Sequence, residues 1–191
     1  MNQRIPLDKV ATIIRGLTHA SDAFAHSGPV FIGQSEVTQS GNVAPRFVKS
    51  GVDNLVILEA GDIVIASMDQ AQRVLVIGDQ LVGAVLGHGC LAIRVEQSSS
   101  LASSAFLAAW MRTDDYRRQA NTLFSGVTIA RLGAKELGAI ELPLLPQRRQ
   151  EALVVLADQF QNARQSLTVA LAHVEQLERI EFEIFFREKD E

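Results

Sequence analysis

The sequence predicts an α+β fold, in which a short-stranded, largely β domain with small helices is followed by one long C-terminal coiled-coil helix. Short apolar runs broken by glycines fill most of the first hundred residues and are typical of short strands. Helical spacing appears after the serines at 98–100. From Gln147 to the last residue there is no Gly or Pro. We therefore expect a domain over residues 1–146 and a long helix over 147–191.

At the N-terminal end, Leu7, Val10, Ala11 and Ile14 recur at helical spacing, which predicts a helix that stops at Arg15-Gly16. The polar, small residues at 17–28 predict a loop. A short strand is expected at Val30–Ile32, followed by Gly33 and a polar turn.

The clearest strand pattern is "LVILEAGDIVIAS", residues 55–67. An apolar run meets a tight turn at Gly61-Asp62, and a second strand is expected over Ile63–Ala66, ending at Ser67. The segments "RVLVIG" and "GAVLGHGCLAIRVE" predict three more short strands with glycine breaks.

A helical segment follows, with serine caps before it and one face that we expect to comprise Leu101, Ala105, Ala108 and Ala109. Asp114-Asp115 lies at a predicted helix start, where carboxylates favour the helix dipole. A last short strand is expected at Ile140–Leu142.

The final segment has a heptad pattern of apolar residues that predicts a coiled coil about 60 Å long. Its seam comprises Leu153, Leu156, Phe160, Ala163, Leu167, Ala170, Val174, Leu177 and Ile184. Only Glu181 interrupts it. A helix of this length cannot bury its whole seam on a small domain, so we expect a partner helix. The alternative is a helix that lies across its own domain.

Composition bears on the expected cellular location and on the expected partners. The single cysteine, Cys90, excludes an internal disulfide framework, and no apolar run is long enough to cross a membrane, so we expect a cytoplasmic protein without a membrane partner. The net charge of −4 is uneven. Residues 1–150 hold 14 Lys and Arg against 13 Asp and Glu, whereas residues 151–191 hold 4 against 9. This balance neither requires nor excludes a polyanion partner.

Patterns typical of catalysis are missing from the sequence. There is no P-loop, no G-x-G-x-x-G after a strand and no histidine spacing suited to a metal. His88 and Cys90 are expected to be a buried pair on one strand face. We therefore expect neither enzymatic activity nor a cofactor.

The order of several motifs resembles the target recognition domain of type I restriction–modification specificity (S) subunits. "SGVTIARL", "GAKELGA" and "IELPLLPQRRQEAL" resemble that family's polar loop, short helix, and proline-containing exit into a spacer helix. "IPLDKVATIIRG", "VFIGQSEV" and "LEAGDIVIAS" resemble its "LGDVAxIxxG", "PxIxxxDI" and "LxxGDIxIS" segments. Ala130 and Arg148 depart from the family pattern. Complete S subunits carry two recognition domains and two spacer helices, whereas this sequence has one of each.

The resemblance implies a non-catalytic half-subunit that forms a homodimer through its C-terminal helix. Such a dimer would bind double-stranded DNA at a bipartite, palindromic site and direct separate DNA methyltransferase, and possibly restriction, subunits to it. Two alternatives stay open at this point. One is an orphan dimeric DNA-binding protein or regulator without enzyme partners, and the other is a coiled-coil adaptor that does not bind DNA.

The resemblance also implies that loops and strand ends enter the DNA grooves. The first candidate loop contributes Ser125, Gly126, Thr128 and Arg131. Its alternative role is to cap the following helix. The second contributes Ser67, Gln70, Gln72 and Arg73, with amides that suit adenine and a guanidinium that suits guanine or phosphate. Its alternative is an ordinary polar hairpin. The third group is Gln34, Ser35, Arg15 and His19.

Overall fold

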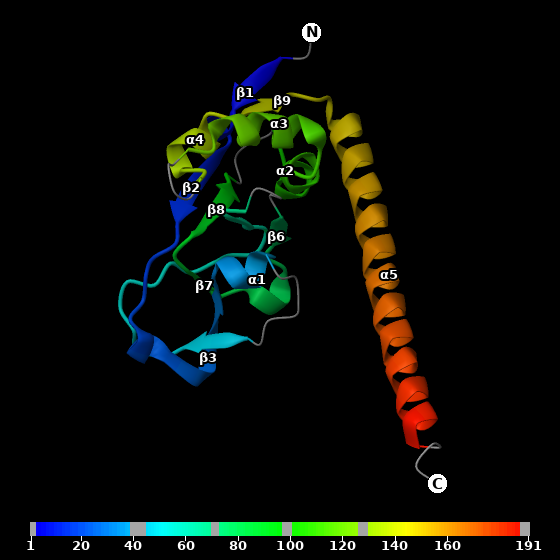
Figure 1. Cartoon of the computed structure of the whole chain (residues 1–191). Helices are drawn as coiled ribbons and strands as arrows, with labels where there is room; N and C mark the ends of the chain where they lie inside the picture. Colours follow the sequence, from blue (N-terminus) through cyan, green and yellow to red (C-terminus); the bar gives the residue numbers. More distant parts are fainter. Residues whose placement is uncertain (1–2, 39–44, 70–72, 97–100, 126–129, 188–191) are drawn as a thin grey trace. The chain divides into compact units, whose positions relative to one another are not determined.

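The structure is a computed structural model, and it describes residues 3–38, 45–69, 73–96, 101–125 and 130–187. The chain forms two compact units, residues 1–150 and residues 151–191 (Figure 1). Because the first turn of the long helix belongs to the first unit, this division falls just beyond the expected boundary at residue 146. The functional division at 146 stays a prediction.

The first unit starts and ends in the same two-stranded ribbon. Strand β1 (Arg4–Pro6) pairs antiparallel with β9 (Glu141–Pro143), and the backbone N–H of Leu7 donates to the Ile140 carbonyl at 2.9 Å. The predicted last strand is therefore confirmed, one residue later than expected. Pairing between the two ends of the domain fixes where the chain leaves for the long helix.

The predicted N-terminal helix over residues 7–14 is wrong. Leu7–Lys9 form a single 3-10 turn, η1, and Ala11–Arg15 form strand β2. The β-branched side chains of Ile13 and Ile14 suit a strand, and β8 (Cys90–Val95) supplies its hydrogen bonds. Tertiary pairing therefore decided a segment whose apolar spacing alone was ambiguous.

A four-stranded antiparallel sheet in the order β2-β8-β5-β6 forms the centre of the unit. Strand β5 (Ile63–Ala66) is completely buried and β6 (Val74–Val76) lies at the edge. Val64 and Ala66 pack into one core cluster with Ile32 and Leu86, while Ile63 is buried on the opposite face. The strand predictions for these segments are confirmed, and both faces of the sheet are covered.

The turn before β5 is held by an ion pair whose carboxylate is buried. Gly61 has a φ of +83°, which favours glycine, and Asp62 is only 1% exposed. The Asp62 carboxylate accepts from the Glu59 backbone N–H at 2.8 Å. It also accepts from Arg94 Nε at 2.9 Å and Arg94 Nη2 at 2.7 Å. The Gly-Asp pair therefore has a structural role.

The expected strand on the other side of this turn is wrong. Within residues 55–59, Ile57 forms only an isolated bridge to Val85, and β5 takes β6 and β8 as partners instead. The tight turn at Gly61-Asp62 therefore leads into β5 from a segment that is not itself a strand.

A second sheet of three strands has the order β4-β3-β7. Strand β3 (Phe24–Ile32) pairs antiparallel with β4 (Arg46–Val48) and parallel with β7 (Val85–Leu86), with an irregularity between Ala25 and Val30. Parallel pairing joins segments that lie far apart in the sequence, which the local pattern could not reveal. Figure 1 shows this sheet at one end of the first unit, and β1 and β9 at the other.

The loop expected over residues 17–28 is only partly correct. Ser21–Ala23 form a 3-10 turn, η2, and β3 already begins at Phe24. After β3, Gln34–Thr38 form a short helix, α1, where a polar turn was expected.

Two short helices follow the central sheet. Helix α2 (Ser104–Trp110) is capped by Ser103, whose hydroxyl accepts from the Phe106 N–H at 3.1 Å. The serines expected to cap a helix starting at Leu101 lie at 98–100, outside the described residues, so the helix begins later than predicted. The predicted face is only half correct: Ala108 and Ala109 are buried, but Ala105 is exposed and Leu101 precedes the helix. Every residue from Phe106 to Trp110 is buried. Periodicity cannot single out one face of a helix that is covered on several sides.

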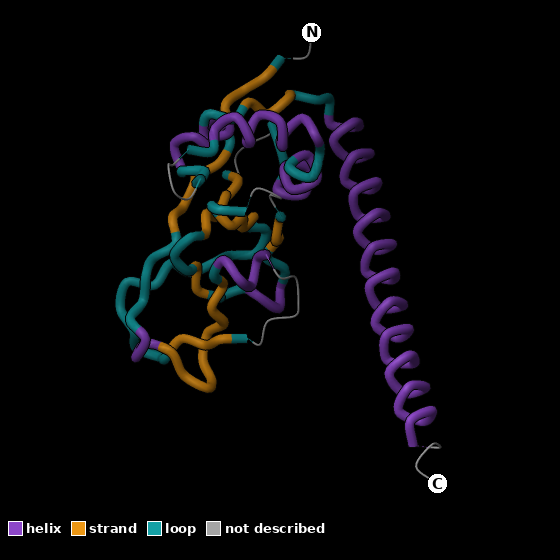
Figure 2. The backbone as a smooth tube through the Cα atoms, viewed as in Figure 1, coloured by secondary structure: helices purple, strands orange, loops and turns teal. Residues whose placement is uncertain are grey.

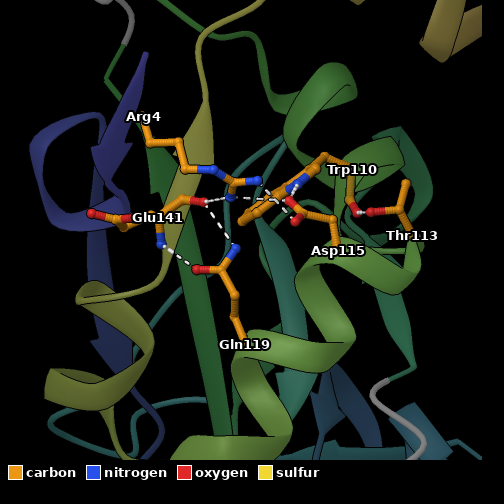
Figure 3. Close-up of polar contacts among 6 residues, drawn as sticks. All are labelled: Arg4, Trp110, Thr113, Asp115, Gln119 and Glu141. Atoms are coloured by element: carbon orange, nitrogen blue, oxygen red, sulfur yellow. Dashed lines mark hydrogen bonds and ion pairs between the residues drawn. The ribbon is translucent and has the colours of Figure 1, made fainter. Parts of the chain in front are cut away.

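Helix α3 (Asp114–Leu123) is tied to the ribbon by a polar network that centres on Asp115 (Figure 3). Arg4 donates to the Asp115 carboxylate through Nη2 at 2.9 Å and Nη1 at 3.2 Å, and Trp110 Nε1 donates to it at 3.0 Å. The Gln119 amide bonds both the carbonyl and the N–H of Glu141 at 3.0 Å. Asp115 therefore does more than favour the helix dipole, because it joins α3 to β1.

The remaining helices agree with expectation. The short helix α4 spans Ala134–Gly138. The long helix α5 spans Gln147–Arg187 without a break and forms the greater part of the second unit (Figure 2). Another 3-10 turn, η3 (Asp79–Leu81), connects β6 to β7.

Candidate nucleic-acid interface

The register of the four-stranded sheet gathers several predicted contact residues at one end of it. Arg15 pairs with Leu91, Ala66 with Cys90, and Ile65 with Val74. The ends of β2 and β5 therefore lie beside the beginnings of β8 and β6. Three predicted residues lie on or next to these strand ends: Arg15, Ser67 and Arg73. We call this end of the sheet, with the segments bonded to it, the recognition edge.

Backbone hydrogen bonds fasten the first candidate loop to this edge. Leu132 donates to the carbonyl of Ser67 at 2.8 Å, and Ser67 donates to the carbonyl of Gly89 at 2.7 Å. Ser125 and Arg131 exchange two backbone bonds of 3.1 and 2.8 Å, which closes the base of the loop. The first and second predicted segments are thus direct neighbours in space.

The third predicted group adjoins the same edge. Gly89 has a φ of +81°, and a Cβ built on it would lie 3.2 Å from the Gln34 side-chain oxygen. Gln34 therefore lies against the turn that starts β8. Next to it, the Ser35 hydroxyl donates to Glu36 at 3.0 Å.

His19 packs against the three-stranded sheet. Its ring lies edge-on to Phe31, with ring centroids 6.3 Å apart. Its Nε2 atom is buried without a hydrogen-bond partner in the part of the chain that the structure describes. This burial makes His19 less accessible to DNA than Arg15, whose side chain is exposed.

The three arginines of the recognition edge differ in what they contact. Arg15 and Arg131 are exposed, and neither forms an ion pair with any described residue. Arg73 lies 3.4 Å from the Asp69 carboxylate, which also accepts from the Arg73 backbone N–H at 3.1 Å. Two guanidinium groups thus have no carboxylate partner among the described residues, whereas the third has one and could offer a polyanion only its remaining N–H groups.

Several predicted contact residues lie outside the described part of the chain. They are Gly126 and Thr128 of the first loop, and Gln70 and Gln72 of the second. Their roles stay predictions.

The expected buried pair of His88 and Cys90 is wrong for the histidine. Cys90 is buried, and desolvation, with a smaller effect of the Glu36 charge, raises the pKa of its thiol to about 12. His88 is exposed in the turn before β8, between Gly87 and Gly89. His88 therefore joins the recognition edge, and a single polar residue between two glycines was the signal that could have indicated it.

The described residues contain no group of three or more His, Cys, Asp or Glu side chains placed to hold a metal ion. Among these residues, no helix is both long and apolar enough to cross a membrane.

The second unit presents a long apolar surface in the single chain. Of the predicted seam residues, Leu156, Phe160, Leu167, Val174 and Leu177 are 47–69% exposed. Leu153 is half-buried, Ala163 and Ala170 are exposed, and the side chain of Ile184 lies outside the described residues. Exposed apolar side chains also lie off the seam: Val155, Val169, Leu171, Ile180, Phe182 and Phe185. The apolar surface of α5 is therefore wider than a two-position stripe.

The mixed sheets followed by one long helix have the fold of type I restriction–modification S subunits, as the motif order suggested. Three solved structures carry this likeness. A chain from a study of complex assembly and conformational transition of a type I R-M system has a TM-score of 0.66 and 19% identity, over 93% of this chain and 43% of that one.

The HsdS subunit from Thermoanaerobacter tengcongensis has a TM-score of 0.60 and 18% identity, over 88% of this chain and 39% of its own. The type I S subunit from M. genitalium has a TM-score of 0.61 and 13% identity, over 87% and 40%. This chain thus spans about two fifths of each structure. No protein-family model and no curated protein matches its sequence.

Proposed function

We propose that this protein is a non-catalytic DNA-recognition component of a type I restriction–modification system. One observation carries the proposal. The sheet register and the bond from Leu132 to Ser67 bring the separately predicted contact segments to one edge, where Arg15 and Arg131 are exposed. Because the likeness to S subunits concerns the fold, DNA binding is inferred from the side chains of this edge.

The recognition edge combines two kinds of contact. Arg15 and Arg131 suit phosphate oxygens or the O6 and N7 atoms of guanine, and Gln34 suits adenine. Ser67 and His88 add smaller hydrogen-bonding groups between them. Gln70, Gln72 and Thr128 belong to the same two loops, so we include them in the proposed surface.

The long helix supplies the second part of the proposal. We infer that α5 pairs with α5 of a second copy through the seam, so that two recognition domains act as the two halves of one specificity subunit. A two-fold dimer presents the same surface twice, which implies a bipartite palindromic target. A helix of about 60 Å limits the separation of the half-sites to roughly 17 base pairs.

The enzymatic chemistry would belong to other chains. We propose that DNA methyltransferase subunits, and possibly restriction subunits, bind this protein in the cytoplasm and take their sequence specificity from it. No cofactor is assigned to the chain itself.

DNA binding by the full-length chain tests the proposal. Binding to a mixed-sequence duplex would be followed by fluorescence anisotropy over a range of salt concentrations. We expect log affinity to fall linearly with log salt, as phosphate contacts require. A chain that binds no duplex at low salt would instead be the coiled-coil adaptor. If DNA binding is present but the purified protein captures no methyltransferase subunit of the same system, an orphan regulator would replace the restriction–modification role.

A further inference from the structure

Arg46 lies over two aromatic rings on the three-stranded sheet. Its Cζ atom is 4.6 Å from the centroid of the Phe31 ring and 5.1 Å from that of Phe24. The two rings are themselves edge-to-face at 5.0 Å and 89°. Both distances from Cζ to a ring centroid are within the range of cation–π attraction. The two aromatic rings therefore help to hold the guanidinium in place.

A carboxylate fixes one side of the same guanidinium. Arg46 Nε donates to Glu36 at 3.3 Å. Glu36 is 9% exposed, and it also accepts from the Gly33 N–H at 2.9 Å and from the Ser35 hydroxyl at 3.0 Å. The charge of Glu36 is thus shared among three donors, while the Arg46 side chain stays 48% exposed.

This cluster is continuous with the recognition edge. Glu36 belongs to α1, the helix that starts with Gln34. Phe31 packs against Gly87, where a Cβ atom would lie only 2.2 Å from the ring, and Gly87 precedes His88. The Phe31 ring below Arg46 therefore contacts the turn that contributes His88.

We propose that Arg46 is an additional DNA contact of this protein and that it binds a backbone phosphate. This inference rests on the proposed function. An ordinary surface arginine loses rotamer freedom when it binds, whereas Arg46 is already ordered by Phe24, Phe31 and Glu36. Because Nε is bonded to Glu36, the Nε edge is not open to a base. A phosphate oxygen needs only the remaining N–H groups, so the contact is independent of sequence.

The test measures the salt dependence of DNA binding for full-length variants. The probe is a labelled mixed-sequence duplex of about 30 base pairs, three helical turns. The slope of log affinity against log salt is compared for wild type, Arg46→Gln and Arg46→Lys between about 50 and 200 mM salt. Lys49→Gln is the matched control, since Lys49 is an exposed cation just after the same strand. Thermal unfolding of each variant verifies that it is folded.

For Arg46→Gln we expect the slope to become shallower by about 0.9 for each engaged domain. Arg46→Lys should keep the slope and bind several-fold more weakly, because the charge remains while the planar, stacked geometry is lost. Phe24→Leu, which removes one ring and leaves the charge, should behave like Arg46→Lys. Lys49→Gln should keep the wild-type slope.

Three results would overturn the inference. They are an unchanged slope in Arg46→Gln, wild-type affinity in Arg46→Lys, and an equal loss of slope in Lys49→Gln. If any of these results appears while Arg131→Gln still weakens DNA binding, only the proposed phosphate contact of Arg46 is rejected. If the wild-type chain binds no duplex at all, the proposed function fails together with it.

Discussion

Leu132 donates its backbone N–H to the carbonyl of Ser67 at 2.8 Å, and this bond joins two loops that are distant in the sequence. One loop follows the completely buried strand β5, and the other precedes helix α4. The bond places side by side two segments that were separately predicted to contact DNA.

Removing the charge of Arg131 or of Arg15 should weaken DNA binding without unfolding the protein. Both side chains are exposed and form no ion pair with a described residue, so their loss removes an attraction to phosphate or guanine. We expect Arg131→Gln and Arg15→Gln each to lower the salt slope by about 0.9 per engaged domain if they contact phosphate. Lys135→Gln, an exposed cation on α4, is the control and should bind as wild type does. Equal losses in all three variants would show that only overall charge matters.

The Asp62–Arg94 pair should be essential for stability. Asp62 is 1% exposed, and its carboxylate accepts three hydrogen bonds, two of them from Arg94. Asp62→Ala leaves a cation without its buried partner, so we expect the free energy of unfolding to fall by about 3 kcal/mol. Glu59→Gln alters an exposed partner of the same arginine and should cost less than about 1 kcal/mol. Urea unfolding measures both, and equal costs would contradict the special role of Asp62.

The Arg4–Asp115 pair should make stability depend on pH in the acid range. Hydrogen bonding from Arg4, opposed by desolvation and assisted by Trp110, holds the pKa of Asp115 below its usual value. A carboxyl whose pKa is depressed on folding stabilises the protein above its unfolded pKa, near 3.8, and loses that contribution as the pH falls through the lower folded pKa.

We therefore expect Asp115→Asn to destabilise the protein by about 1 kcal/mol at neutral pH, and to differ little from wild type below the folded pKa. Chemical unfolding at neutral and at acid pH would measure the difference. Asp114→Asn, at an exposed neighbour 3.8 Å from Arg117, is the control and should change little at either pH. A difference that persists unchanged in acid would rule out the ion pair as its cause.

Charge placed in the seam of α5 should dissociate the proposed dimer. Leu167 and Leu177 lie on the seam and are 69% and 61% exposed in the single chain. We expect Leu167→Glu or Leu177→Glu to reduce the mass measured by light scattering from dimer to monomer, because a seam position cannot keep a carboxylate hydrated. Val169→Glu lies off the seam, is 50% exposed in the single chain, and should stay dimeric. A monomeric wild type would contradict the pairing itself and, with it, the palindromic target.

Local sequence determined the elements whose pattern is long and uninterrupted, or is clearly bounded by Gly and Pro residues. The absence of Gly and Pro after Gln147 predicted α5 and its first residue. The order of the weak motifs also indicated the right fold, since each of them marks a turn or an exit. Except for His88, the residues of the recognition edge were named as candidates through the resemblance, although nothing in the sequence showed that they meet.

Tertiary structure alone decided the elements whose local pattern is ambiguous. Residues 11–15 have apolar spacing that fits a helix, yet they form β2, because β8 offers hydrogen bonds along its whole length. Helix α2 is buried on several sides, so it does not have the single apolar face that its spacing predicted. Antiparallel register placed Arg15 beside Leu91 and, through β8 and β5, near Ser67 and Arg73. Which strands pair depends on contacts between distant segments, so the sequence supplied candidate contact residues and only the folded chain brought them to one edge.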